Sequence, residues 1–227
     1  MALLAMAGAD IRVADTAMRQ YDEQLDRWEQ QYTYTQDAGT RQQLLASRPD
    51  ARRTTQVVLK AIGAELSRPS SMRAIAWIYE NDASFLRDPA FGNAGEAIRN
   101  AMNRALYNKP GAGALCLTIS QHFSPQDLGF LEKVAKQAPT AEEQGQASLA
   151  VSIALSTLGD DPALITKRLQ HLRHAIKTIP EDMEINGKKV TDVISDQLYV
   201  IQYLSKGRTA PNFEGACLLY TSDAADD

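Results

Sequence analysis

The chain has 227 residues, of which 44% are hydrophobic and 7% aromatic, and its formal net charge is −4. This length suits one domain, or one and a half, with a substantial buried core. A mildly acidic chain lacks the basic footprint that binding to nucleic acid or to anionic membranes usually requires. No apolar run approaches the roughly 20 residues of a membrane-spanning helix. We therefore expect neither a nucleic-acid partner nor a membrane span.

Residues 1–9 resemble the back half of a secretory signal. They are short and apolar, and they end in Ala7-Gly8-Ala9, which has the Ala-x-Ala form of a signal cleavage site. The basic front region of a signal is absent, and a frayed helix start is the alternative. We expect a partial signal peptide over residues 1–9 and an exported protein, either periplasmic or attached to the outer side of a membrane.

The helical part of the chain begins with a long apolar seam. Apolar residues recur at alternating steps of three and four from Ile11 to Tyr32, which predicts one long helix. Such a seam docks on the protein's own core more often than it forms a coiled coil with another chain, which remains the alternative. We expect this helix to end near Gly39 and a short helix to follow over residues 40–48.

Caps and breaks divide the next part into further helices. Asp50 can cap the first of them, and Ser70 or Ser71 the second. We expect these helices over residues 51–66, 72–80 and 94–107, with a loop over residues 81–93 that contains Pro89 and Gly92. The expected inward side chains are Val57, Val58, Ile62 and Leu66, then Ile75, Ile78 and Tyr79 around Trp77, and then Ile98, Met102 and Leu106.

A more apolar group of helices follows the turn at residues 108–111. Residues 112–122 are apolar nearly all round, which predicts a buried helix. Ser124 precedes Pro125 as the cap of a helix that runs to Ala138. The expected inward side chains of that helix are Leu128, Leu131 and Val134 or Ala135.

Thr140 and Glu143 have the spacing of a capping box, in which each side chain accepts a backbone N–H of the other residue. The helix that they start is expected to continue through Leu158 and to stop at Gly159-Asp160. Its small residues should let a neighbouring helix approach closely. These residues are Gly145, Ala147, Ser148, Ala150 and Ser152.

The last predicted helices flank a tight turn. Asp161-Pro162 starts a helix that runs to about Ile179, and Asn186-Gly187 forms the turn between two short extended arms. The final helix covers residues 191–206. The expected inward side chains are Ile165, Leu169, Leu172 and Ile176 in the first helix, and Ile194, Leu198, Ile201 and Leu204 in the second.

These elements together predict an all-α fold. Loosely similar amphipathic helices, none able to bury its apolar face alone, favour antiparallel pairs stacked as an α-solenoid of tetratricopeptide-like kind. No strict sequence repeat is visible. We assign the helical-repeat domain to residues 10–206 and expect an extended segment after it.

Histidine provides the first candidate site. His171 and His174 are three apart on one helix and could supply two metal ligands. The neighbouring Lys167, Arg168, Arg173 and Lys177 would repel a cation, so we interpret this surface as a solvated basic face. His122 reads as a helix-terminal residue with a hydrogen-bonded ring.

The remaining candidates also favour structural roles. Cys116 lies in the most apolar segment, where a thiol is normally inert. Glu142 and Glu143 resemble a paired-carboxylate site, but the capping box explains them. Gly111-Ala112-Gly113 lacks the Lys-Ser/Thr ending of a phosphate-binding loop. We expect no catalytic residue, bound cofactor or metal ligand within this chain.

A short motif follows the last predicted helix. Gly207 can stop that helix, Pro211 biases Ala210 toward extended backbone, and Phe213 is a single large apolar anchor. These residues form a Gly-x-x-Ala-Pro-x-Phe pattern, which resembles the opening of the redoxin domain in TlpA-like thiol-disulfide reductases and in peroxiredoxin relatives. Residues 142–150 and 196–201 are similar to segments of the N-terminal region of exported bacterial redoxin proteins.

The resemblance implies that residues 207–216 begin a thioredoxin-fold domain whose cysteines lie farther downstream. Such a domain would attack a disulfide or a peroxide through a thiolate. Cys116 and Cys217 do not match the family's catalytic positions. The resemblance therefore implies that this chain is a non-catalytic accessory domain, with its own downstream redoxin domain as one partner.

The alternative is a free-standing helical-repeat module that binds a protein or peptide through the array. An α-helical enzyme that depends on His171 or His174 is a third and weaker hypothesis.

Residues 217–227 resemble a translated sequencing adapter rather than a native tail. Their back-translation is similar to the end of a transposase library adapter. We therefore leave these residues out of the fold prediction and treat Cys217 as foreign to the natural protein.

Overall fold

A computed structural model of the chain describes residues 11–88, 91–185 and 187–204. Within these ranges the fold is all-α, as predicted, and one short hairpin forms the only sheet that they contain. The helices are α1 (Ile11–Tyr34), α2 (Ala38–Ala46), α3 (Ala51–Ile62), α4 (Met72–Asp82), α5 (Ala94–Ala101), α6 (Ala112–Gln121), α7 (Leu128–Gln137), α8 (Ala141–Ser156), α9 (Pro162–Thr178) and α10 (Val190–Tyr199). Short 3₁₀ turns precede α4 and α7 and follow α3 and α4, and π-helical turns extend α5 and α10.

The helices α1, α4, α6 and α8 form one layer of the array, each packed against the next. Arg73 forms an ion pair with Asp15 at 3.6 Å, and Trp77 Nε1 donates to Asp22 Oδ1 at 2.8 Å. Trp77 follows Arg73 in α4, and its partner Asp22 follows Asp15 in α1, so the two helices run in the same direction. The first turns of α6 and α8 likewise lie together, at Gly113 and Glu143.

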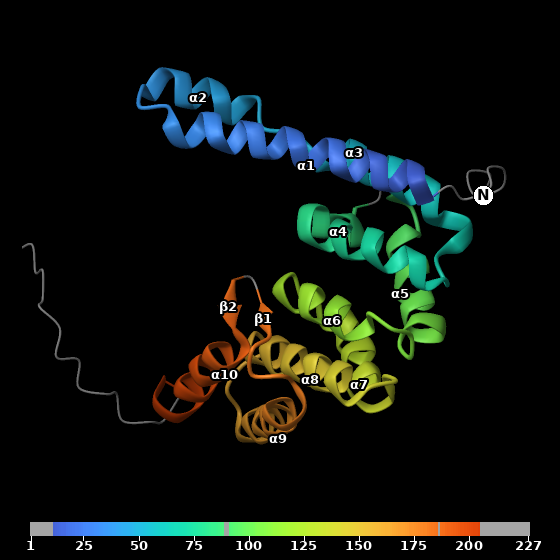
Figure 1. Ribbon diagram of the computed structural model, residues 1–227, viewed down its shortest axis with the longest axis vertical. Coiled ribbons are helices and arrows are strands. Elements are labelled where there is room, and N and C mark those ends of the chain that lie inside the picture. Colours follow the sequence, from blue (N-terminus) through green and yellow to red (C-terminus); the bar gives the residue numbers. More distant parts are fainter. Residues whose placement is uncertain (1–10, 89–90, 186, 205–227) are drawn as a thin grey trace, which may run out of the picture.

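In the chain, α3, α5 and α7 lie between successive members of this layer, and α9 follows α8. The helix α3 packs on α1 and α4, α7 packs on α6 and α8, and α9 packs on α8. Gly145, near the start of α8, lies against Thr178 at the end of α9, so these two helices are antiparallel. Figure 1 shows the resulting stack, from α1 and α3 at one end to α9 and α10 at the other. The predicted helical array is therefore confirmed.

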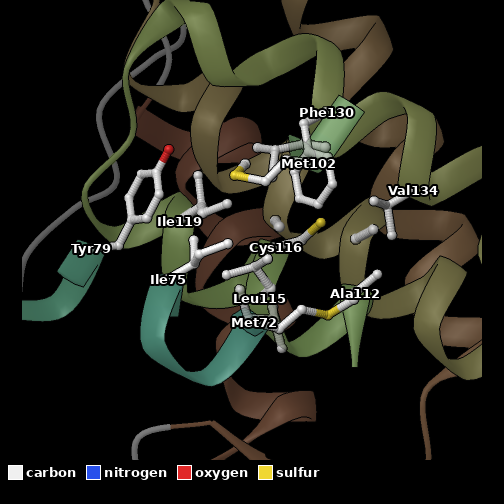
Figure 2. Close-up of a cluster of buried hydrophobic side chains, with 14 of the residues drawn as sticks. Met72, Ile75, Tyr79, Met102, Ala112, Leu115, Cys116, Ile119, Phe130 and Val134 are labelled. Carbon is white, nitrogen blue, oxygen red and sulfur yellow. The ribbon is translucent and has the colours of Figure 1, made fainter. Parts of the chain in front are cut away.

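The core is centred on α6 and α8, the two helices whose sequences are apolar or small on nearly every side. Most of α6 is buried, as predicted, and α8 is buried continuously from Gly145 to Ser152. Figure 2 shows side chains of α4, α6 and α7 meeting around Cys116, with Met102 filling the space beside Phe130. At the edge of this cluster Tyr79 donates its hydroxyl to Asp127 Oδ1 at 3.0 Å, so the buried phenol has a polar partner.

Two glycines explain how the helices of the core approach so closely. A Cβ at Gly113 would lie 2.8 Å from the Cα of Glu143, and one at Gly145 would lie 2.8 Å from Ile179 Cγ1. Both distances are shorter than a van der Waals contact allows. The prediction that the small residues of α8 permit close packing is confirmed.

Several predicted caps and boundaries are correct. Asp50 Oδ1 accepts the N–H of Arg52 at 2.9 Å and caps α3. Ser124 and Asp127 form a reciprocal capping box before α7. The strands β1 (Glu184–Ile185) and β2 (Lys188–Lys189) are the two short arms predicted around the turn, in which Gly187 has a φ of 73°. Asn186 lies outside the described residues.

Other boundaries were wrong. The helix α1 ends at Tyr34, and Asp37 Oδ2 accepts the N–H of Thr40 at 2.7 Å to start α2, so Gly39 lies inside a helix rather than ending one. Ser71 does not cap α4, because its hydroxyl donates to the carbonyl oxygens of Leu66 and Arg68. The predicted loop after α4 contains a further 3₁₀ turn, over Ala83–Leu86.

Three residues predicted to point inward are exposed: Val57 at 45%, Ile176 at 52% and Leu204 at 51%. Thr55 and Val58 are buried in α3, and Arg168, Leu172 and Ala175 in α9. Part of the predicted apolar stripe is therefore exposed to solvent in α3, in α9 and in the π-helical turn after α10. Periodicity gives the width of such a stripe, whereas the neighbouring helices decide which side of it is covered.

Some predictions fall on residues that the structure does not describe. These are the partial signal over residues 1–9, the redoxin-like segment over residues 207–216, the adapter-like residues 217–227, and Pro89. Among the described helices, none combines the length and the apolar character needed to cross a membrane.

Candidate functional site

A polar hollow lies where α1, the start of α3 and the end of α4 meet. Its volume is about 370 Å³, and it is lined by Tyr21, Arg48, Pro49, Asp50, Ala51, Arg52, Asn81, Asp82 and Ser84. We call this feature the polar hollow. It was missed from the sequence, because Asp50 and Asp82 are far apart in the chain and each belongs to a helix end. Only the packing of α3 beside α4 brings them together.

Asp82 is the buried charged side chain of this hollow, with 8% of its surface exposed. Its Oδ1 accepts a hydrogen bond from the Ser84 hydroxyl at 2.6 Å. Its Oδ2 is buried and has no hydrogen-bond partner among the described residues. A buried acceptor left in this state costs about 1–3 kcal/mol, and more when it is charged.

The charges around the hollow are unevenly balanced. Burial raises the pKa of Tyr21, and the nearby Asp50, Asp22 and Asp82 raise it further, while Arg48 opposes them. Arg52 forms an ion pair with Asp88 at 2.8 Å. Arg48 and Arg52 line the hollow together with Asp50 and Asp82, so its wall carries charges of both signs.

An arm, made of the distal half of α1 and the whole of α2, projects beyond the stack (Figure 1). The rings of Trp28 and Tyr32 stack with centroids 5.1 Å apart, and the guanidinium of Arg41 lies 4.8 Å from the Tyr32 centroid. Arg48 lies 5.5 Å from the Trp28 ring, and Trp28 Nε1 donates to the carbonyl of Leu44 at 2.7 Å. No residue of α2 is buried. These ring contacts therefore attach α2 to α1 in place of a core.

The histidine pair lies on the side of α9 that faces α7. Both rings are half-buried, and Lys167 forms an ion pair with Glu132 of α7. Burial lowers the pKa of His171, Lys167 lowers it further, and Glu132 opposes the shift. Within the described part of the chain, no group of three or more His, Cys, Asp or Glu residues is placed to hold a metal ion.

The interpretation of this surface as a solvated basic face was wrong in part. Arg168 is fully buried, with Nη1 3.2 Å from Asp160 Oδ1 and Nη2 3.3 Å from Gln197 Oε1. Arg173 and Lys177 are exposed, as predicted. Arg168 thus joins the start of α9 to α10, a role that its position among basic residues concealed.

Cys116 is a free thiol at the centre of the core (Figure 2). Burial raises its pKa well above the ordinary value, and Glu143 raises it further. Since the thiolate is the reactive form of cysteine, burial favours the unreactive thiol here, and the inertness of Cys116 stays a prediction.

Only half of the capping box at the start of α8 forms. Thr140 Oγ1 accepts the N–H of Glu143 at 3.2 Å. The Glu143 carboxylate accepts the N–H of Gly111 instead of returning to Thr140. Gly111 adopts a φ of 93° ahead of α6, so the glycines at 111 and 113 serve helix entry and packing. His122 is exposed at the end of α6, as expected of a terminal residue.

Comparisons with protein-family models, with curated proteins and with solved structures found no match to this chain.

Proposed function

We propose that this helical array is the non-catalytic accessory domain of an exported, thioredoxin-like redoxin protein. The Gly-x-x-Ala-Pro-x-Phe pattern from Gly207 to Phe213 follows closely on the last described helix. On this proposal the disulfide or peroxide chemistry belongs to cysteines of the domain that the pattern opens. The array would hold that domain and, through its remaining surface, a protein partner.

The observation that carries the proposal is the apolar end of the array. The helix α10 and its π-helical extension, Val200–Leu204, expose Tyr199 at 43%, Tyr203 at 39% and Leu204 at 51%. The two tyrosine rings lie with centroids 5.0 Å apart. The last unit of a helical array usually has a polar outer face, which keeps the array soluble. Exposed apolar side chains at the end of α10, beside exposed polar residues such as Asp192 and Asp196, suit a unit that a following domain covers in part.

The decisive experiment is to express the natural gene beyond Ala216 and to assay the longer protein and the present chain for disulfide and peroxide reduction. We expect the longer protein to contain a thioredoxin-like strand and helix pattern and to be active, and the present chain to be inactive. A continuation without that pattern, or reduction by the present chain alone, contradicts the proposal.

The apolar end can be tested in the same longer protein. Tyr203→Glu should increase proteolysis between the two domains, because it puts a charge into the proposed contact. Tyr34→Glu is the matched control, since Tyr34 is 83% exposed on the arm, far from this end. Equal proteolysis of the two variants would count against the contact.

A free-standing binding module is the second candidate, favoured by the direction of α1, α4, α6 and α8. Like-directed helices side by side resemble one layer of a tetratricopeptide-type solenoid, whose surface binds peptides. Glu80 of α4 accepts from the Thr118 hydroxyl of α6 at 3.5 Å, so exposed polar side chains link these two helices of the layer. This candidate predicts a native stop codon soon after Ala216.

A further inference from the structure

Among the described methionines, Met183 is the one that is not buried. Met18, Met72 and Met102 are 1%, 6% and 0% exposed, whereas Met183 is half-buried between α9 and β1. The hairpin that follows Met183 packs on α10 (Figure 1). An oxidant has to reach a thioether sulfur before it can react with it, so exposure selects among methionines. The structure therefore sets Met183 apart from the three methionines of the core.

A buried amide of α8 points at the sulfur of Met183. Gln146 is 6% exposed, and its Nε2 lies 3.6 Å from Met183 Sδ. The same nitrogen donates to Glu142 Oε1 at 3.2 Å. Because a carboxylate only accepts hydrogen bonds, Glu142 fixes the amide with its nitrogen, rather than its oxygen, on this side. One N–H of Gln146 is thus held against a thioether, which is a weak acceptor.

The surroundings fix the amide and the backbone of this contact but leave the thioether free to adjust. A Cβ at Gly113 of α6 would lie 2.5 Å from Gln146 Oε1, so the amide oxygen occupies the space that the glycine leaves. The carbonyl oxygen of Met183 accepts the N–H of Val190 at 2.9 Å, which closes the base of the hairpin. The methionine side chain has three rotatable bonds, so its sulfur can move without moving the backbone.

We propose that Met183 is a site of reversible oxidation by a hydroperoxide, and that Gln146 binds the oxygen that the sulfur acquires. The sulfur attacks the outer oxygen of the peroxide, and the S–O bond forms as the O–O bond breaks. The proton of the outer oxygen passes to the leaving oxygen, so a sulfide and ROOH give a sulfoxide and ROH. Sulfur loses the two electrons that the peroxide gains, and methionine sulfoxide reductases reverse the change.

The buried donor gives the sulfoxide a place in the fold. A sulfoxide is polar, and its oxygen accepts hydrogen bonds better than a thioether sulfur does. The N–H of Gln146 that faces the sulfur therefore gains a stronger acceptor on oxidation. The residues of this site are all described, so the proposal does not depend on a redoxin domain that follows the array.

The first test treats the full 227-residue chain with hydrogen peroxide and follows each methionine by peptide mass spectrometry. In the folded chain we expect sulfoxide to form at Met183 at least about tenfold faster than at Met18, Met72 or Met102. The four should react at similar rates in concentrated urea, where none is covered. Methionine sulfoxide reductase should restore Met183 without denaturant. Similar rates at the four residues of the folded chain, or a sulfoxide that the reductase does not repair, would overturn the proposal.

The second test asks whether Gln146 binds the new oxygen. Gln146→Leu has a similar size but no donor, and Gln170→Leu is the matched control, because Gln170 is exposed on α9. Amide hydrogen exchange at Val190 reports on the base of the hairpin. On oxidation its protection should persist in the unsubstituted chain and in Gln170→Leu, and should fall at least about fivefold in Gln146→Leu.

The same bond can be observed by NMR without a variant at Gln146. The side-chain amide proton signal of Gln146 should move downfield when the unsubstituted chain is oxidised. Met183→Leu treated with peroxide should show neither this shift nor a change in exchange at Val190, which excludes the other methionines as the cause. An unmoved Gln146 signal, or Val190 protection that is lost on oxidation of the unsubstituted chain, would contradict the assignment of Gln146.

Discussion

At the scale of single residues, burial of His171 links protonation to the stability of the folded chain. The ring lies between α9 and α7, where the charged groups around it are Lys167, Lys136, His174 and Glu132. Burial lowers its pKa below the ordinary value of 6.5. Well above pH 6.5, the ring is neutral in both the folded and the unfolded state. As the pH falls through 6.5 the unfolded chain binds the proton first, so the folded state loses stability until the pH passes the folded pKa.

We therefore predict that His171→Gln reduces the acid sensitivity of the fold. The free energy of unfolding of the natural chain, measured with urea, should fall between about pH 7.5 and about pH 5 more steeply than that of the variant. His122→Gln is the control, because His122 is exposed at the end of α6. The same difference in slope for both variants would rule out His171 as the source.

At the scale of helices, the close contact between α8 and α9 depends on Gly145. A Cβ there would lie 2.2 Å from Thr178 Oγ1 and 2.8 Å from Ile179 Cγ1. Gly129 in α7 is a matched case, since a Cβ at that position meets nothing within 4 Å. The same substitution should therefore have opposite effects at the two positions.

Gly145→Ala is predicted to lower the free energy of unfolding by about 1–3 kcal/mol, because the added methyl group forces α8 and α9 apart. Gly129→Ala should raise it by about 0.5–1 kcal/mol, because alanine is the better helix former and the site is open. Chemical denaturation of both variants measures the difference. A stabilised Gly145→Ala would mean that the two helices separate without cost.

The sequence best predicts which side chains of a helix are buried where that burial does not depend on the position of a neighbouring helix. The helix α6 is apolar on almost every side, so it is buried whichever way it turns, and α8 carries its small residues in one run. The stripes of α3 and α9 were predicted less well. Val57 and Val58 are equally apolar, and only the position of α1 and α4 decides that Val58 is the buried one.

At the scale of the whole molecule, the order of the stack could be predicted from the sequence, but the polar hollow could not. Several helices that follow one another in the chain also pack together, such as α7 with α8 and α8 with α9, as short connections favour. Asp50 and Asp82, in contrast, meet because α3 and α4 lie against each other. Each is an ordinary helix-end residue in the sequence. No local pattern marks the unpartnered oxygen of Asp82.

Stability should decline from the centre of the array toward the arm. The helix α8 is buried over most of its length and packs on α6, α7 and α9, whereas α2 has no buried residue. We predict that amide hydrogen exchange is slowest in α8 and α6 and fastest, among the described helices, in α2. Equal protection of α2 and α8 would show that the arm unfolds only together with the core.

The shared direction of α6 and α8 also has an electrostatic consequence. Each helix has a macrodipole with partial positive charge at its N-terminus, so two helices that start side by side place like partial charges together. The Glu143 carboxylate accepts the Gly111 N–H at the start of α6 while it sits in the first turn of α8. One negative side chain thus compensates two positive helix ends, and this favours the parallel arrangement on which the layer is built.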